Sequence, residues 1–291
     1  MNRRIYINEL SLNGQFSDME EFLKKNKRFV STLVWLQKNN WIIYKKSTLY
    51  TCHISKKDTM NHLRGLKSTT NPEDRDLILK YKRLLLSLED NPPFWDQEEK
   101  EVEDKYYLED EDITSSSIAK SCDNGRCVLS FYNDRFVDKI LQVKKGSCGS
   151  IDVFSVFSIN YMNEVLYQRK EITINEYINT RYKNTRLNFS RLEEGFGLEI
   201  LEKDEIEDCI ESFDRFVDHE NWENLNRDRS LNYKEYSPSS KKDDWFRNTE
   251  YSEKKIYKFR CANPKRCFGY REKEQFYVLR IERNHKISDR G

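Results

Sequence analysis

The sequence predicts a mixed α+β chain that ends in a small antiparallel β-sheet. Residues 4–12 alternate their side chains as a strand does, whereas residues 18–37 repeat apolar side chains at helical spacing. After Ile256, three short alternating segments are separated by turn residues. The chain has 291 residues, of which 37% are hydrophobic, so it is long enough to bury a stable core.

We expect the N-terminal region, residues 1–112, to combine helices and strands. The first strand is followed by an Asn13-Gly14 turn, and the helix over 18–37 ends before Asn39. The other expected elements are short strands over 41–44 and 48–53 and helices over 59–66 and 74–88. The region closes on an acidic stretch, residues 96–112, with ten acidic residues and two lysines, a charge of −8. Such a run is typical of a solvated face or a mobile linker.

The middle region, residues 113–225, is predicted to be α/β. A strand begins at Val128, and the β-region continues to Ile159 with a loop over 146–149. Helical patterns follow from Ile174, interrupted near residues 193–197, and then over 205–219. Residues 226–244 are rich in polar and turn-forming side chains and indicate a linker.

Composition excludes several classes of function. No stretch approaches the eighteen or so apolar residues of a spanning helix, and no export signal is visible, so we expect a cytoplasmic protein without a membrane partner. No phosphate-binding glycine motif is present, and no cofactor is expected. The seven cysteines indicate reduced thiols. Cys122 with Cys127, and Cys261 with Cys267, leave a zinc site open, although their spacing is wide for one.

The C-terminal segment, residues 245–291, is strongly basic. It has thirteen Lys and Arg residues against six Asp and Glu residues, a charge of +7 in a chain whose net charge is +1. This asymmetry is typical of a surface that binds a polyanion. The segment could instead dock onto the acidic stretch, and the two alternatives differ in their salt dependence.

Three consecutive antiparallel strands are predicted in this segment. They cover residues 256–260, 266–271 and 275–283, with turns at 263–264 and 272–274. In the last strand we expect Phe276, Val278 and Arg280 on one face and Tyr277, Leu279 and Ile281 on the other. Basic and aromatic side chains would thus be interleaved on one small sheet.

Arg260, Arg266, Tyr270, Arg271 and the run 283–286 give this segment a resemblance to the C-terminal strands of the RelE/ParE toxin superfamily. The resemblance implies an endoribonuclease, in which a ribose 2′-hydroxyl attacks the neighbouring phosphate. Its implied catalytic residues are His285, as acid or base, with Arg283 and Arg260 on the phosphate. The implied nucleic-acid-binding residues are Arg266, Tyr270, Arg271, Tyr277, Arg280 and Lys286. The expected partners are RNA or another single-stranded nucleic acid and a cognate protein inhibitor or defence-system component.

Residues 6–16 are also similar to the start of uncharacterised bacterial and phage-linked proteins associated with defence, which favours a toxin or antiphage role. Because RelE/ParE toxins usually stand alone, a non-catalytic nucleic-acid- or protein-binding component and a structural subunit remain open alternatives. Glu199, Glu202 and Lys203 offer a further alternative, since they are similar to the acidic-x-Lys ending of metal-dependent nucleases.

Overall fold

The computed structural model describes residues 3–66, 72–100, 102–146 and 149–287. It divides into two compact units, residues 1–165 and 166–291, and each is described by itself. Both contain helices and sheets, so the predicted α+β class is confirmed. Within the described ranges, no helix is long and apolar enough to cross a membrane.

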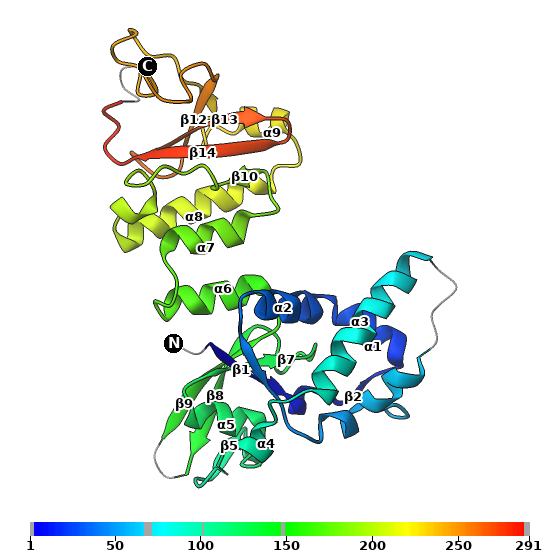
Figure 1. Ribbon diagram of the computed structural model, residues 1–291. Helices are drawn as coiled ribbons and strands as arrows, with labels where there is room; N and C mark the ends of the chain where they lie inside the picture. Colours follow the sequence, from blue (N-terminus) through cyan, green and yellow to red (C-terminus); the bar gives the residue numbers. More distant parts are fainter. Residues whose placement is uncertain (1–2, 67–71, 101, 147–148, 288–291) are drawn as a thin grey trace. The chain divides into compact units, whose positions relative to one another are not determined.

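Unit 1 is built around a seven-stranded sheet in the order β3-β1-β7-β9-β8-β5-β6 (Figure 1). Its strands are β1 (Arg4–Asn8), β3 (Ile42–Tyr44), β5 (Tyr106–Leu108), β6 (Glu111–Asp112), β7 (Cys127–Ser130), β8 (Lys139–Lys145) and β9 (Ser150–Val156). The first four in sheet order are parallel, and the other three are antiparallel to their neighbours. Helix α2 (Lys27–Lys38) packs Phe29 on Phe131 at one face, and α5 (Ser117–Asp123) buries Ile118 and Ala119 at the other.

The smaller elements of unit 1 refine the expected pattern. They are η1 (Glu9–Ser11), β2 (Asn13–Phe16), α1 (Met19–Lys25), η2 (Leu49–Thr51), β4 (His53–Ser55), η3 (Met60–Gly65), α3 (Pro72–Asp90) and α4 (Trp95–Glu98). The predicted helix over 18–37 is two helices, because the Asn26 side chain bonds both the Phe22 carbonyl and the Tyr132 N–H. The predicted strand over 48–53 is instead η2 followed by β4.

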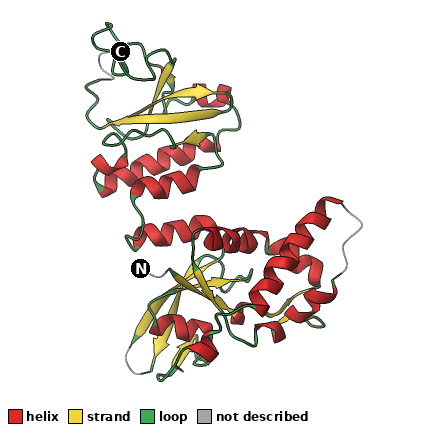
Figure 2. Ribbon diagram, in the orientation of Figure 1, coloured by secondary structure: helices red, strands yellow, loops and turns green. Residues whose placement is uncertain are grey.

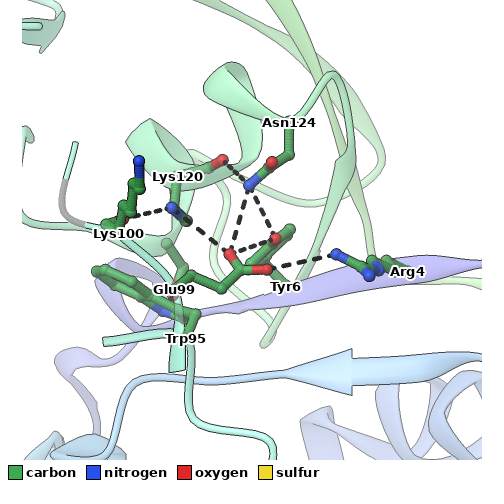
Figure 3. A network of polar contacts seen from close by, with 8 residues as sticks. Arg4, Tyr6, Trp95, Glu99, Lys100, Lys120 and Asn124 are labelled. Atoms are coloured by element: carbon green, nitrogen blue, oxygen red, sulfur yellow. Dashed lines mark hydrogen bonds and ion pairs between the residues drawn. The ribbon is translucent and has the colours of Figure 1, made fainter. Parts of the chain in front are cut away.

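The acidic stretch is part of the packed structure of unit 1. Figure 3 shows the Glu99 carboxylate among Arg4, Tyr6, Lys120 and Asn124, and the Tyr6 hydroxyl donates to it at 2.9 Å. Burial and this carboxylate raise the pKa of Tyr6. Further carboxylates of the stretch form ion pairs with cations of the same unit: Asp104 with Lys145, Asp110 with Lys144, Asp112 with Lys105, and Glu109 and Glu111 with Arg135.

Unit 2 packs helices on one face of a five-stranded sheet in the order β10-β14-β13-β12-β11 (Figure 2). The strands are β10 (Leu187–Asn188), β11 (Lys234–Glu235), β12 (Ile256–Arg260), β13 (Arg266–Glu272) and β14 (Gln275–Glu282). The helical elements are α7 (Ile174–Tyr182), η4 (Leu198–Ile200), α8 (Lys203–Asp218) and α9 (Trp222–Arg227), and α6 (Ile159–Gln168) carries the boundary between the units. The three predicted strands are therefore present as an antiparallel meander.

The two units differ from the three regions expected from sequence. The expected boundary after residue 112 falls within unit 1, since β5 and β6 belong to the same sheet as β7 and β8. Residues 226–244 are not a free linker in this structure. They contain β11, which pairs with β12, and Tyr233 and Tyr236 are buried in the cores on opposite faces of the sheet.

A β-bulge changes the predicted alternation along β14. Phe268 lies opposite Arg280 but Gly269 lies opposite Val278, so Leu279 is the extra residue. A Cβ atom at position 269 would lie 2.1 Å from the Tyr277 carbonyl oxygen, which explains the glycine. Beyond the bulge Ile281 joins the helix-facing core, and Arg280 contacts aromatic rings on the other face, contrary to the simple alternation.

Candidate functional site

The residues predicted to form the site lie in two groups along the meander. At one end Arg260 is opposite Arg266, which is in turn opposite Glu282. Tyr270 and Tyr277 face each other further along β13. Tyr270 lies four positions beyond Arg266 along β13, a rise of about 14 Å, so a single phosphate cannot contact both groups.

The aromatic side chains of the second group stack on one another. Tyr270 is buried and stacks on Tyr277 and Tyr251, with ring centroids 5.2 and 6.0 Å apart. Arg271 is exposed, and its guanidinium lies 4.1 Å from the centre of the Trp222 ring. The buried Tyr270 ring leaves no open face for a base, whereas Tyr277 is half-buried.

Arg280 is a structural cation. It makes a two-pronged ion pair with Glu193, at 2.9 and 2.7 Å, and donates to the Trp245 carbonyl at 2.6 Å. Its guanidinium also lies within 5.2 Å of the ring centres of Phe196, Phe246 and Trp245. With 9% of its side chain exposed, Arg280 has its donors engaged inside the fold, so it does not fit the predicted role in nucleic-acid binding.

Arg283 is also paired within unit 2. Its guanidinium lies 3.0 Å from Glu205 and 3.6 Å from Glu202, at the start of α8. The buried Lys265 ammonium also lies 2.8 Å from the Glu205 carboxylate. The Lys265 hydrogen bond, a backbone N–H of Glu202 and Arg283 together hold the pKa of Glu205 at about 2. Arg283 therefore neutralises acidic residues of its own unit.

The other predicted cations have different surroundings. Arg266 is buried and donates to the carbonyls of Pro264 and Lys265, both at 2.9 Å. His285 follows β14 in a left-handed backbone conformation, with φ of 57°, and is half-buried. Lys286 is exposed beside it.

Arg260 lines a polar pocket of about 350 Å³, which we call the Arg260 pocket. Its other lining residues come from α8 and from two loops: Asp208, Glu211, Ser212, Arg215, Ser230, Leu231, Ala262 and Asn263. The wall formed by α8 follows from helical spacing, because residues 208, 211, 212 and 215 share one face. Arg260 is held in place by its backbone N–H, which donates to the Leu231 carbonyl at 2.6 Å.

The charged side chains of the Arg260 pocket are unpaired. In the described part of the chain, Asp208, Glu211, Arg215 and Arg260 form no hydrogen bond or ion pair through their side chains. The Arg260 Nε is buried, yet it has no hydrogen-bond partner. A buried donor without a partner is costly in a folded protein. The pocket thus offers two guanidinium groups, two carboxylates and two hydroxyls to a ligand.

Sequence reasoning identified Arg260 but missed the α8 side of the pocket. The apolar face of this helix was recognised from Ile206, Cys209, Ile210, Phe213 and Phe216, of which Ile210 is half-buried and the other four are buried. The opposite face, which carries Glu211 and Arg215, has the composition of an ordinary solvated surface. The only sequence feature that pointed to a site on this face was the repetition of charged and hydroxyl residues at helical spacing.

The alternative sites suggested by sequence have structural explanations. Glu199 accepts backbone N–H groups from Gly195 and Gly197 at 2.9 and 3.1 Å, so its carboxylate holds a turn. Glu202 caps α8. Cys261 and Cys267 are buried in the core with Cys209, and burial raises the pKa of both. Within the described ranges, no group of three or more His, Cys, Asp or Glu side chains is arranged to hold a metal ion.

We compared the chain with protein-family models, curated proteins and solved structures, and none of the three comparisons found a match.

Proposed function

We propose that the Arg260 pocket binds an RNA phosphate and that the protein is a metal-independent endoribonuclease. The observation that carries the proposal is the presence of unpaired guanidinium and carboxylate groups in one pocket. Guanidinium groups bind phosphate with a forked pair of donors, and carboxylates accept protons. Arg280 and Arg283, in contrast, are already matched by acidic partners.

The proposed reaction is cleavage by the ribose 2′-hydroxyl. Glu211 takes the hydroxyl proton, the O2′–P bond forms, and the P–O5′ bond breaks, while water protonates the departing 5′ oxygen. Arg260 and Arg215 hold the phosphate and stabilise the extra negative charge that develops on its oxygens. The products would be a 2′,3′-cyclic phosphate and a 5′-hydroxyl end.

The basic charge of residues 245–291 and their resemblance to RelE/ParE toxins support RNA as the substrate and a role as a toxin or antiphage effector. The resemblance assigns the proton transfer to His285, whereas the residue that the Arg260 pocket supplies for this role is Glu211. Separate variants distinguish these two residues. The second candidate function is RNA binding without cleavage, which the unpaired arginines alone would support.

The test is cleavage of a short fluorescent single-stranded RNA in the presence of EDTA. Glu211→Gln should lower the single-turnover rate by about 10²- to 10⁴-fold and leave RNA affinity nearly unchanged. Glu207→Gln is the matched control, because Glu207 is exposed on the same helix and pairs with Lys203 outside the pocket.

Arg260→Ala should lower both affinity and cleavage rate, with exposed Arg247→Ala as its control. Loss of cleavage in His285→Ala, with Glu211→Gln fully active, would move the proton transfer to His285. RNA binding without cleavage would support only the second candidate function, RNA binding. Cleavage that requires a divalent metal would contradict the proposal.

A further inference from the structure

A groove in unit 1 lies between α2 and α3. Its volume is about 700 Å³, and its walls come from residues 34–38 and 79–84. This is within the range of binding pockets in proteins. We call it the α2–α3 groove.

The apolar residues that line the groove are partly exposed. Leu79 is 37% exposed, one of three large hydrophobic residues exposed to this degree in the described part of the chain. Val34 and Leu84 line the groove beside it and are half-buried. Exposed apolar surface of this kind marks interaction sites when polar residues surround it.

The rim of the groove is basic. Lys38, Lys80 and Arg83 line it and are exposed. Within the described ranges, these three cations form no ion pair or hydrogen bond through their side chains. Several acidic side chains elsewhere in unit 1 are paired with other cations, as Asp104 is with Lys145. Among the residues that the structure describes, no acidic one lines the groove.

We infer that the α2–α3 groove docks an amphipathic helix with acidic flanks from a partner protein. The wall residues repeat at helical spacing, Val34 with Lys38, Leu79 with Arg83 and Lys80 with Leu84, so each wall is a helix face. A third helix covers such a groove with its apolar residues and places Glu or Asp beside the cations. A nucleic-acid backbone would satisfy the cations but would leave Val34, Leu79 and Leu84 uncovered.

Fluorescence anisotropy with a labelled peptide of roughly 18 residues tests this inference. The probe is an amphipathic helix with a leucine face flanked by glutamates, and the comparison peptide carries lysines in place of the glutamates. The acidic peptide should bind the full chain saturably, and the lysine peptide should bind about tenfold more weakly or worse. Leu79→Glu should lower affinity for the acidic peptide by about tenfold or more.

Ile140→Glu is the matched control, because Ile140 is 48% exposed on β8 outside the groove. Lys80→Glu with Arg83→Glu should also weaken binding of the acidic peptide. Equal binding of both peptides, no saturable binding, or equal effects of Leu79→Glu and Ile140→Glu would overturn the inference. So would a short RNA that displaces the peptide, or self-association of the chain that Leu79→Glu abolishes.

Discussion

Arg280 and Arg260 belong to the same three-stranded meander and to the same basic and aromatic sequence pattern, yet the fold uses them differently. Arg280 is held by Glu193, the Trp245 carbonyl and three aromatic rings. Arg260 faces a polar pocket, and its Nε has no partner. The comparison teaches that the availability of a cation, and not its presence in a basic segment, distinguishes a binding residue from a structural one.

The largest expected effect is on Arg280. Arg280→Ala should lower the free energy of unfolding by about 3–5 kcal/mol, because it leaves Glu193 without its partner in a mostly buried position. Lysine should not restore stability, since it cannot make the two-pronged pair or stack on the rings. Urea unfolding measures both variants, and a loss under about 1 kcal/mol would show that the pair is not structural.

Glu205→Gln should have a smaller effect on stability. Glu205 is the ion-pair partner of the buried Lys265 and also of Arg283, so the change leaves a buried ammonium without a carboxylate. The expected loss is about 1–3 kcal/mol in urea unfolding. Glu207→Gln on the same helix serves as the control. Equal losses of stability in the two variants would show that the ion pairs of Glu205 do not stabilise the fold.

The same carboxylate should make stability depend on pH. Its pKa is lowered from 4.5 to about 2, so the unfolded chain binds the proton more readily than the folded chain. The contribution of Glu205 is therefore complete above its unfolded pKa and declines as the pH falls toward 2. The stability difference between wild type and Glu205→Gln should shrink over this window. A difference that stays constant from pH 6 to pH 2 would contradict this pKa shift.

The smallest effect on stability is expected at the pocket itself. Arg260→Ala should change the free energy of unfolding by about 0.5 kcal/mol or less, because no hydrogen bond or ion pair of the Arg260 side chain to a described residue is lost. The same variant should weaken RNA binding and reduce the slope of log affinity against log salt by about one. Chemical unfolding and a salt titration on one preparation measure the two effects. A large loss of stability without a change in slope would show that Arg260, like Arg280, has a structural role.

Local sequence patterns predicted much of the meander. The strands, the turns at 263–264 and 272–274, and the buried face of α8 all depend on residues close together in the chain. The bulge at Gly269 was not predicted, because it requires the close approach of the Tyr277 carbonyl. Short-range patterns also gave no reason to expect 3₁₀ structure at residues 49–51.

The candidate site was predictable only in part. Arg260 carried a signal, but its neighbours Glu211 and Arg215 lie on a helix far from it in sequence. Glu193 is 87 residues from Arg280, so nothing local separates a paired arginine from an unpaired one. The net charge of +7 likewise does not show which cations are available, since acidic residues of unit 2 pair with Lys265, Arg280 and Arg283.

The most direct test of the central claim is NMR of the arginine Nε–Hε groups during titration with a short single-stranded RNA. Signals are assigned with the Arg260→Ala, Arg215→Ala and Arg280→Lys variants. The account predicts that the Arg260 and Arg215 signals shift together and saturate, because both guanidinium groups bind phosphate, while the Arg280 signal stays in place. Saturable shifts at Arg280 with an unchanged Arg260 signal would contradict it.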